Sequence, residues 1–125
     1  MALRMSATAR PRASGSRSAA VGGGGTAGAT GRGEDVIKSC ASYYIVMRMA
    51  AGRSPQEACE DALEMIRDKY RKVNPDYMPG EKFVAMNLAG EVGAAWSYEG
   101  GQPRMSVRTA SGLDIYSGTN FNAGG

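Results

Sequence analysis

Histidine is absent from this 125-residue sequence, and its absence removes several common kinds of chemistry. Without histidine, Ser-His-Asp and Cys-His catalysis are excluded, and a catalytic zinc site is not expected. No apolar run approaches the ~20 residues of a membrane-spanning helix. We therefore expect no metal, no other cofactor and no membrane contact.

Acidic residues are missing near the N-terminus, since Arg4, Arg10, Arg12 and Arg17 all precede the first acid. The excess of basic residues that gives the net charge of +3 therefore lies in the first 33 residues. The rest of the chain is close to neutral and lacks a basic face interleaved with aromatic residues. We expect no nucleic-acid partner.

Cysteine is limited to Cys40 and Cys59, and both fall on apolar faces of expected helices. Buried, reduced cysteines acting as small hydrophobic residues are the favoured interpretation. A disulfide between them stays open as an alternative.

Residues 1–25 show no pattern typical of a folded element. The first 20 are rich in Ala, Ser and Arg, as in transit peptides, but they lack a clear amphipathic face. A glycine tract follows, which is too flexible for the interior of an element. We expect a disordered leader or a misassigned gene start, with a transit peptide as the alternative.

The segment Gly23-x-Gly25-x-x-Gly28 matches the dinucleotide-binding fingerprint GxGxxG. That fingerprint requires a buried strand directly before it, and residues 10–20 are not expected to form one. We interpret the match as a result of glycine density. An anion- or nucleotide-binding module is the minor alternative.

Two amphipathic helices are expected after the glycine tract. Apolar residues at three- and four-residue spacing predict the first over residues 34–51. The second begins at the capping box Ser54-Pro55-Gln56-Glu57 and runs to about residue 73. Because the connection between them is very short, an antiparallel helical hairpin is predicted.

Three strands are expected next, over residues 82–88, 92–97 and 104–110. Residues 83–86 of the first strand are consecutive and apolar, so both faces of that strand should be covered. The second strand carries unusually small residues at 93–95, which favours close approach by another layer. The third alternates apolar and polar residues, so one of its faces should meet water.

These elements predict an α+β fold in which a helical hairpin packs on an antiparallel β-meander. The polar, glycine-rich tail, residues 111–125, is expected to be flexible, and only residues 113–116 are apolar enough to extend the sheet. The doubly apolar strand needs a cover on its second face, and no remaining part of the chain is expected to supply it. We therefore interpret the sequence as part of a larger domain.

The stretch Gly28-Ala29-Thr30-Gly31-Arg32-Gly33-Glu34-Asp35 joins the glycine-rich run to the first expected helix. It places one hydroxyl among small residues, directly before a helix that starts with two acids. The N-terminus of a helix presents unpaired N–H groups, which suit an oxyanion. The stretch is therefore the candidate binding site of the sequence.

This stretch, extended to Ile37, closely resembles the C-terminal part of the threonine-nucleophile asparaginase family, with the glycosylasparaginase branch nearest. The resemblance continues through Gly52–Cys59 and through the hairpin from Phe83–Asn87 to Gly93–Trp96. For residues 26–110 it implies part of an αββα sandwich of the N-terminal-nucleophile hydrolase type. In that family the enzyme is made as a precursor that cuts itself into two subunits. The resemblance further implies cleavage of the side-chain amide of (glycosyl)asparagine or of a β-aspartyl bond.

The resemblance also implies roles for individual residues. The Thr30 hydroxyl and the Gly31 N–H would form an oxyanion hole, and Thr30, Gly31, Arg32 and Gly33 would border the substrate. The removal of one oxyanion-hole donor typically costs about 2.7–4 kcal/mol in the transition state.

Several family features are missing from this sequence: the nucleophilic threonine, the Asp-Thr cleavage pair and the Gly-Arg-Val-Gly-Asp segment that holds the substrate. We therefore expect two partners, a small asparagine-derived substrate and the missing N-terminal subunit of the same enzyme, and no activity from this chain alone. The alternative is an inactive truncated or mispredicted product with a structural role only. The compartment and the choice among substrates stay open.

Overall fold

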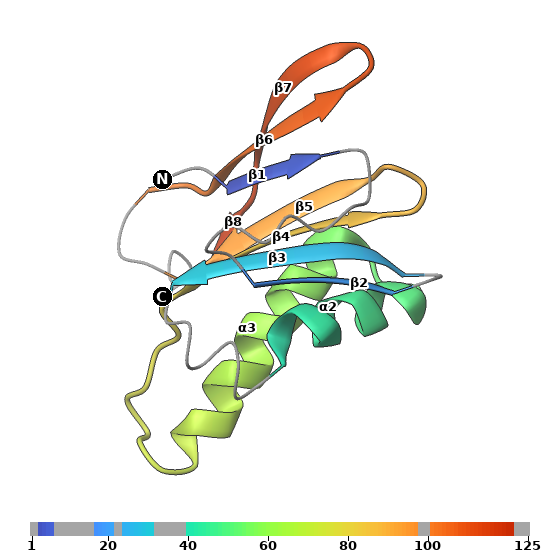
Figure 1. Cartoon of the computed structure of the whole chain (residues 1–125). Coiled ribbons are helices and arrows are strands. Elements are labelled where there is room, and N and C mark those ends of the chain that lie inside the picture. Colours follow the sequence, from blue (N-terminus) through green and yellow to red (C-terminus); the bar gives the residue numbers. More distant parts are fainter. Residues whose placement is uncertain (1–2, 7–16, 22–23, 32–39, 98–100, 122–125) are drawn as a thin grey trace.

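The computed structural model describes residues 3–6, 17–21, 24–31, 40–97 and 101–121 (Figure 1). The elements are, in chain order, β1 (Leu3–Ser6), β2 (Arg17–Val21), β3 (Gly25–Gly31), α2 (Ala41–Ala50), α3 (Pro55–Arg71), β4 (Glu81–Asn87), β5 (Val92–Trp96), β6 (Arg104–Thr109), β7 (Gly112–Ser117) and β8 (Thr119–Asn120). Neither of the two described helices is long and apolar enough to span a membrane.

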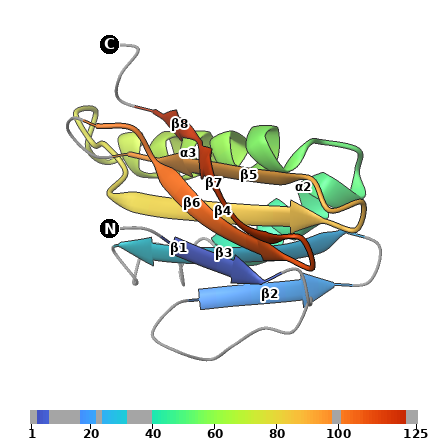
Figure 2. The ribbon, with the colours of Figure 1, turned by 90° about the horizontal axis from the view of Figure 1, so that it is seen from above.

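The strands form two sheets, and the helices cover one face of the larger sheet. The larger sheet has the order β2-β3-β4-β5-β8, and the smaller sheet has the order β1-β6-β7. The smaller sheet lies across the face of the larger one that is opposite α2 and α3 (Figure 2). The fold is therefore a mixed α+β arrangement in which the larger sheet is the middle layer.

Strand β4 lies inside the larger sheet, and both of its faces are covered, as its run of apolar residues predicted. Phe83 and Ala85 belong to the core cluster shared with the helices. Val84 and Met86 belong to a second cluster that includes Met105 of β6. The expectation that this chain could not cover the second face was wrong, because β6 covers it.

The predicted three-stranded meander was also wrong in its last step. Strands β4 and β5 pair in antiparallel fashion as expected, but β6 pairs with β1 and β7 in the smaller sheet. The alternation in β6 explains this position, since Met105 and Val107 are buried while Arg104 and Arg108 are exposed. An amphipathic strand can cover an apolar sheet face as well as extend a sheet edge.

The small residues of β5 permit close packing of α3, as predicted. A Cβ atom on Gly93 would lie 2.2 Å from the backbone nitrogen of Gln56, in the first turn of α3. The Gln56 side chain then pairs with the same strand: its Nε2 donates to the Ala94 oxygen at 2.9 Å, and its Oε1 accepts from the Ala94 nitrogen at 3.0 Å. The helix start is thus fastened to β5 by backbone contact and by a side-chain amide.

The tail expected to be flexible over residues 111–125 is largely built into the two sheets. Strand β7 pairs antiparallel with β6, and β8 pairs in parallel with β5. The Phe121 nitrogen donates to the Trp96 oxygen at 2.8 Å, and the Phe121 side chain packs on the helix-side core. The tail finds partners because β5 and β6 each have an edge with backbone groups that can form hydrogen bonds. Strand β8 pairs with the edge of β5, and β7 pairs with the edge of β6. Residues 122–125 lie outside the described part of the chain.

The N-terminal segment also differs from the expected disordered leader. Strand β1 pairs in parallel with β6, with Leu3 opposite Met105, and β2 pairs antiparallel with β3, with Val21 opposite Gly25. Hydrogen bonding along existing sheet edges can order a segment that has little apolar character of its own. Residues 7–16 of this segment lie outside the described part of the chain.

The glycines of the apparent dinucleotide fingerprint have a different role in the structure. Gly25 and Gly28 lie within β3, and not in a turn between a strand and a helix. The strand before them, β2, was not expected from the sequence, but it is antiparallel to β3 and so does not form the βαβ unit of that fingerprint. Gly25 has a φ of 132°, and a Cβ there would lie 2.1 Å from the Met86 oxygen.

The first described helix is shorter than the expected helix over residues 34–51. Cys40 has φ 50° and ψ 42°, a left-handed conformation through which an α-helix cannot continue, so α2 begins at Ala41. The expected start at Glu34 lies outside the described residues. Cys40 is exposed, contrary to expectation, whereas Cys59 is buried as predicted, and no disulfide joins them.

The second helix is confirmed from its first residue. Ser54 and Glu57 form the reciprocal capping box: the Glu57 nitrogen donates to Ser54 Oγ at 3.1 Å, and the Ser54 nitrogen donates to Glu57 Oε2 at 3.0 Å. Pro55 occupies the first helical position, where its lack of an N–H carries no cost. The hydrogen bond from the Ser54 backbone and the nearby Arg53 charge lower the pKa of Glu57.

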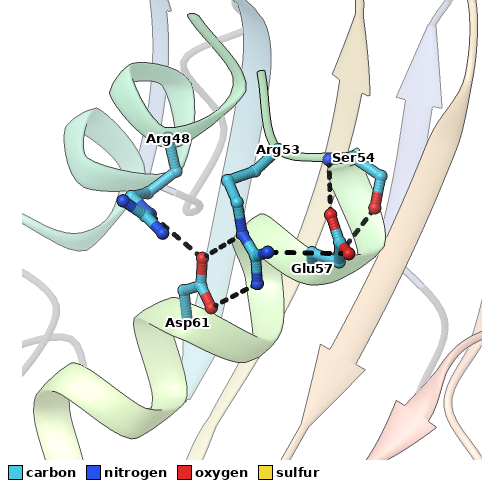
Figure 3. Close-up of polar contacts among 5 residues, drawn as sticks. All are labelled: Arg48, Arg53, Ser54, Glu57 and Asp61. Carbon is cyan, nitrogen blue, oxygen red and sulfur yellow. Dashed lines mark hydrogen bonds and ion pairs between the residues drawn. The ribbon is translucent and has the colours of Figure 1, made fainter. Parts of the chain in front are cut away.

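An ion-pair network holds the end of α2 to α3 (Figure 3). Asp61 on α3 accepts hydrogen bonds from Arg48 Nε at 3.0 Å, from Arg53 Nε at 2.9 Å and from Arg53 Nη2 at 3.0 Å. Partial burial raises the pKa of Asp61, but the hydrogen bonds from Arg53 and Arg48 outweigh it, and the pKa is lowered overall. The network fixes the short connection between the two helices.

Candidate functional site

Thr30 and Gly31, the two residues implied for an oxyanion hole, end strand β3. In the antiparallel register Thr30 lies opposite Lys82 and Gly31 lies opposite Glu81 on β4. Ala29, next to Thr30, is buried in the helix-side core. Because side chains alternate along a strand, the half-buried Thr30 side chain lies on the other face, toward the smaller sheet.

The structure places only part of the expected substrate-bordering segment. Thr30 and Gly31 are described, whereas Arg32 and Gly33 lie outside the described residues. Thr30 lies at the end of β3, and the helix start expected at Glu34 lies outside the described residues.

Three residues beside Thr30 were not singled out by the sequence analysis. Lys82 and Glu81 open strand β4, and Trp96 ends β5, opposite Lys82 in the register. The Lys82 Nζ lies 4.5 Å from the centroid of the Trp96 ring, a cation–π geometry. Glu81 is completely buried and, by alternation, lies on the helix side. The sequence did contain a sign of this position: Glu81 and Lys82 are two charged residues at the start of an otherwise apolar strand.

A small hollow opens on the same face, between the ends of β4 and β5 and the start of β6. Its volume of about 10 Å³ is close to the size of one water molecule. The lining residues come from three strands and the segment before β6: Lys82, Phe83, Val84, Ala94, Ala95, Trp96, Pro103 and Arg104. The hollow can therefore admit a single polar atom but not a whole sugar or nucleotide.

The described residues supply donors of hydrogen bonds and positive charge rather than metal ligands or a nucleophilic thiol. Over the described ranges, no group of three or more His, Cys, Asp or Glu side chains could hold a metal ion. Burial, followed by the nearby charge of Glu60, raises the pKa of Cys59, so this thiol stays protonated. At this end of the sheet, Thr30 carries a hydroxyl and Lys82 an ammonium group, and both groups can donate hydrogen bonds.

Comparison with known proteins decides what kind of protein carries this site. The chain matches the family described as asparaginase over residues 14–111, which is most of its length. The chain belongs to the asparaginase family. The match includes the stretch from Thr30 to Gly33, both helices and strands β3 to β6. The asparaginases and glycosylasparaginases of this family are hydrolases, and the resemblance drawn from the sequence is confirmed.

Curated relatives match shorter stretches. The chain is 41% identical over 73 residues to the N(4)-(β-N-acetylglucosaminyl)-L-asparaginase of Elizabethkingia miricola, over 56% of this chain and 21% of the relative. It is also 38% identical over 58 residues to fatty acyl-CoA reductase 1 of Pongo abelii and of Homo sapiens, over 43% of this chain and 11% of those proteins. The chain thus spans about a fifth of the length of the asparaginase relative.

Proposed function

We propose that this chain is the C-terminal part of an asparaginase-type amidohydrolase that cleaves the side-chain amide of (glycosyl)asparagine or a β-aspartyl bond. In this proposal, Thr30 and Gly31 supply the oxyanion hole, Arg32 and Gly33 border the substrate, and another segment supplies the nucleophilic threonine. The proposal is carried by the position of Thr30 and Gly31 at the end of β3, within the stretch that matches the family.

The mechanism follows from the charge that develops during amide cleavage. A threonine hydroxyl attacks the side-chain carbonyl carbon, with its own α-amino group as the local base. The carbonyl oxygen becomes negatively charged, and the Thr30 hydroxyl and Gly31 N–H donate hydrogen bonds to it. A small hydroxyl residue beside a glycine suits this task, because bulk would keep the oxygen from both donors.

The arrangement of layers also supports a complete αββα sandwich in the assembled enzyme. Helices, a larger sheet and a smaller sheet are present, which is three of the four layers. Leu113 and Ile115 of β7 are 61% and 58% exposed. They lie on the outer face of the smaller sheet, since their register partners Arg108 and Ser106 alternate with the buried Met105 and Val107. We propose that a second helical layer covers these side chains.

Reconstitution tests the proposal. The full chain is mixed or co-expressed with a polypeptide that carries the nucleophilic half of the Elizabethkingia miricola relative, and aspartate release is measured from asparagine and from N4-(β-N-acetylglucosaminyl)-asparagine. We expect turnover from the mixture and none from either part alone. Thr30→Val should lower kcat about 10²–10³-fold, because one oxyanion donor is lost.

Matched variants separate catalysis from folding. Thr30→Ser, which keeps the hydroxyl, should retain most of the activity. Thr109→Val, which makes the same substitution at an exposed position in β6, should leave the rate unchanged. Full activity of Thr30→Val in the mixture would exclude the proposed oxyanion role. Failure of every mixture to react would favour the alternative, a product with a structural role only.

A further inference from the structure

We propose that the outer face of the smaller sheet docks an amphipathic helix in which acidic side chains flank an apolar stripe. The helix would belong to the missing N-terminal subunit of the same enzyme, so the proposal rests on the proposed function. It adds the chemistry by which this chain recognises that subunit, which a covering helical layer alone does not define.

The outer face is built from alternate residues of β6 and β7, on the side of the larger sheet away from the helices (Figure 1). It contains three rows of register partners: Arg108 with Leu113, Ser106 with Ile115, and Arg104 with Ser117. Partners in an antiparallel register share a face, with Cβ atoms about 4.5–5.5 Å apart. The residues between them on β6, Met105 and Val107, are buried against the larger sheet, so these rows point away from it.

Leu113 and Ile115 form a short apolar ridge on this face. Each is more than half exposed. Two residues apart on one strand, they lie about 7 Å from each other. Apolar residues three and four apart on a helix have Cβ atoms about 5–6 Å apart, so a helix can present a matching pair to this ridge.

Two arginines lie at the ends of the same face. Arg104 and Arg108 are exposed, and neither forms an ion pair with a described residue. Asp114 is the acid nearest to them in the sheet, but it is the register partner of the buried Val107 and so lies on the other face. The described side chains of the outer face therefore carry two positive charges and no negative charge.

The spacing of the two arginines defines the partner more closely. Four residues apart on a strand, Arg104 and Arg108 have Cα atoms about 13 Å apart. On a helix lying along the strands, residues about seven or eight apart share a face and are separated by about 10.5–12 Å. The long arginine side chains can span the remaining difference. The partner helix should therefore carry two acids at this spacing, with apolar residues between them.

The same features favour a subunit of the enzyme over other occupants. A second copy, packed face to face, would bring the arginines of both chains together, and like charges repel. An anionic lipid surface would match the charge but not the fixed spacing. The chain spans about a fifth of the length of its asparaginase relative, so most of such an enzyme is available as the partner.

Synthetic helical peptides test the surface on the full chain. The acidic peptide has about 18 residues, with two Glu seven apart and Leu residues between them on one face. Two matched peptides carry Gln or Lys in place of both Glu. Calorimetry should show saturable binding of one Glu peptide per chain, about tenfold weaker binding of the Gln peptide and none of the Lys peptide, because the arginines attract only the acids. Added salt should weaken the binding of the Glu peptide.

Variants assign the binding to this face. The double variant Arg104→Glu/Arg108→Glu should reject the Glu peptide and bind the Lys peptide, a reversal that a general loss of structure cannot produce. Ile115→Ser should weaken the Glu peptide about tenfold, because apolar contact is lost. The controls Lys72→Glu and Val73→Ser make similar changes at exposed positions at the end of α3 and should bind as the unaltered chain does. Circular dichroism checks each fold, and if a variant does not fold, the three peptides on the unaltered chain decide the question.

Several results would overturn the proposal. Equal binding of the Glu and Gln peptides, no saturable binding, or undiminished binding of the Glu peptide to the folded double variant would each reject it. Binding to phosphatidylserine vesicles but to no peptide would assign the face to a membrane. Concentration-dependent dimers that Ile115→Ser abolishes, without peptide binding, would assign it to a second copy.

The reconstituted mixture separates this proposal from the proposed function. If the chain binds the Glu peptide as expected but no mixture gives turnover, the docking surface stands and the proposed activity fails. If Thr30→Val lowers turnover as expected while Arg104→Glu/Arg108→Glu leaves assembly and turnover unchanged, the proposed function stands and the docking surface fails.

Discussion

At the scale of single residues, the Asp61 carboxylate joins three parts of the helical layer: the end of α2, the connection and α3. Its side chain is 14% exposed, while those of Arg48 and Arg53 are each 39% exposed. Solvent screens pairs of this kind, so their value is far below that of a buried pair. The bidentate contact with Arg53 still gives Asp61 more ordered partners than most surface carboxylates have.

We predict that Asp61→Asn lowers the free energy of unfolding at pH 7 by roughly 1 kcal/mol, a value discounted for solvent screening. The pKa of Asp61 is lowered in the folded chain, so its stabilisation is complete above the ordinary carboxyl pKa and is lost as pH falls through the lowered value. The variant should therefore lose less stability than the unaltered chain on acidification. Urea denaturation between pH 7 and pH 3 measures both effects.

The control for this prediction is Asp68→Asn on the same helix. The Asp68 side chain is 66% exposed and forms an ion pair with its neighbour Arg67 at 3.0 Å. Its replacement should change the free energy of unfolding by less than about 0.5 kcal/mol. Equal effects of the two variants would contradict the role assigned to the Asp61 network.

At the scale of elements, the contact between α3 and β5 depends on the absence of a side chain. A Cβ on Gly93 would meet backbone atoms of Gln56 and Pro55, none of which can rotate away. We predict that Gly93→Ala destabilises the chain by about 1–3 kcal/mol, as overpacking in a core does. Thermal denaturation measures the loss.

Gly28→Ala in neighbouring β3 is the matched control for this packing argument. A Cβ on Gly28 would lie 3.6 Å from Val84 Cγ2, an ordinary van der Waals distance. The midpoint of thermal unfolding should therefore stay close to that of the unaltered chain. A larger loss from Gly28→Ala than from Gly93→Ala would show that close approach of α3 is not what requires the glycine.

Local sequence signals predicted elements better than they predicted partners between elements. The capping box fixed the start of α3, and the run of apolar residues around Phe83 correctly indicated a strand covered on both faces. The break at Cys40 gave no such signal, because a left-handed cysteine is unusual and depends on tertiary context. The pairing of β6 with β1 also escaped prediction, since nothing in an alternating strand indicates which edge it will join.

The candidate site was predictable only in part, for a related physical reason. Thr30 and Gly31 are candidates because the stretch around them resembles the family, and their roles stay a prediction. Lys82 lies opposite Thr30, and Trp96 lies opposite Lys82, only through the register of three strands, which depends on long-range pairing. The sequence without this register could not show that the three residues form one row across the sheet.

At the scale of the whole molecule, β8 closes an edge of the larger sheet. It pairs with β5, and Gln56 and Glu60 of α3 hold its Thr119 hydroxyl through contacts of 2.8 and 2.7 Å. The guanidinium carbon of Arg67, Cζ, also lies 5.2 Å from the centroid of the Phe121 ring, in a cation–π contact. Removal of this segment would leave an unpaired edge of β5, which is a template for association with another chain.

We predict that truncation after Ser117 produces concentration-dependent dimers or aggregates, because the uncovered edge of β5 can pair with a second copy. Size-exclusion chromatography with light scattering measures this over a range of concentrations. Truncation after Phe121, which keeps β8, is the control and should behave as the full chain does. A monodisperse monomer after the longer deletion would show that β8 does not protect this edge.

The pairing of β1 with β6 has a consequence for the order in which the chain can fold. Leu3 lies opposite Met105, so β1 is synthesised about a hundred residues before the strand with which it pairs. Contacts between positions so distant in sequence form slowly, because loop closure must precede them. The helices and the β4–β5 hairpin are built from local contacts and should form first, and the smaller sheet can close over them only after β6 has been synthesised.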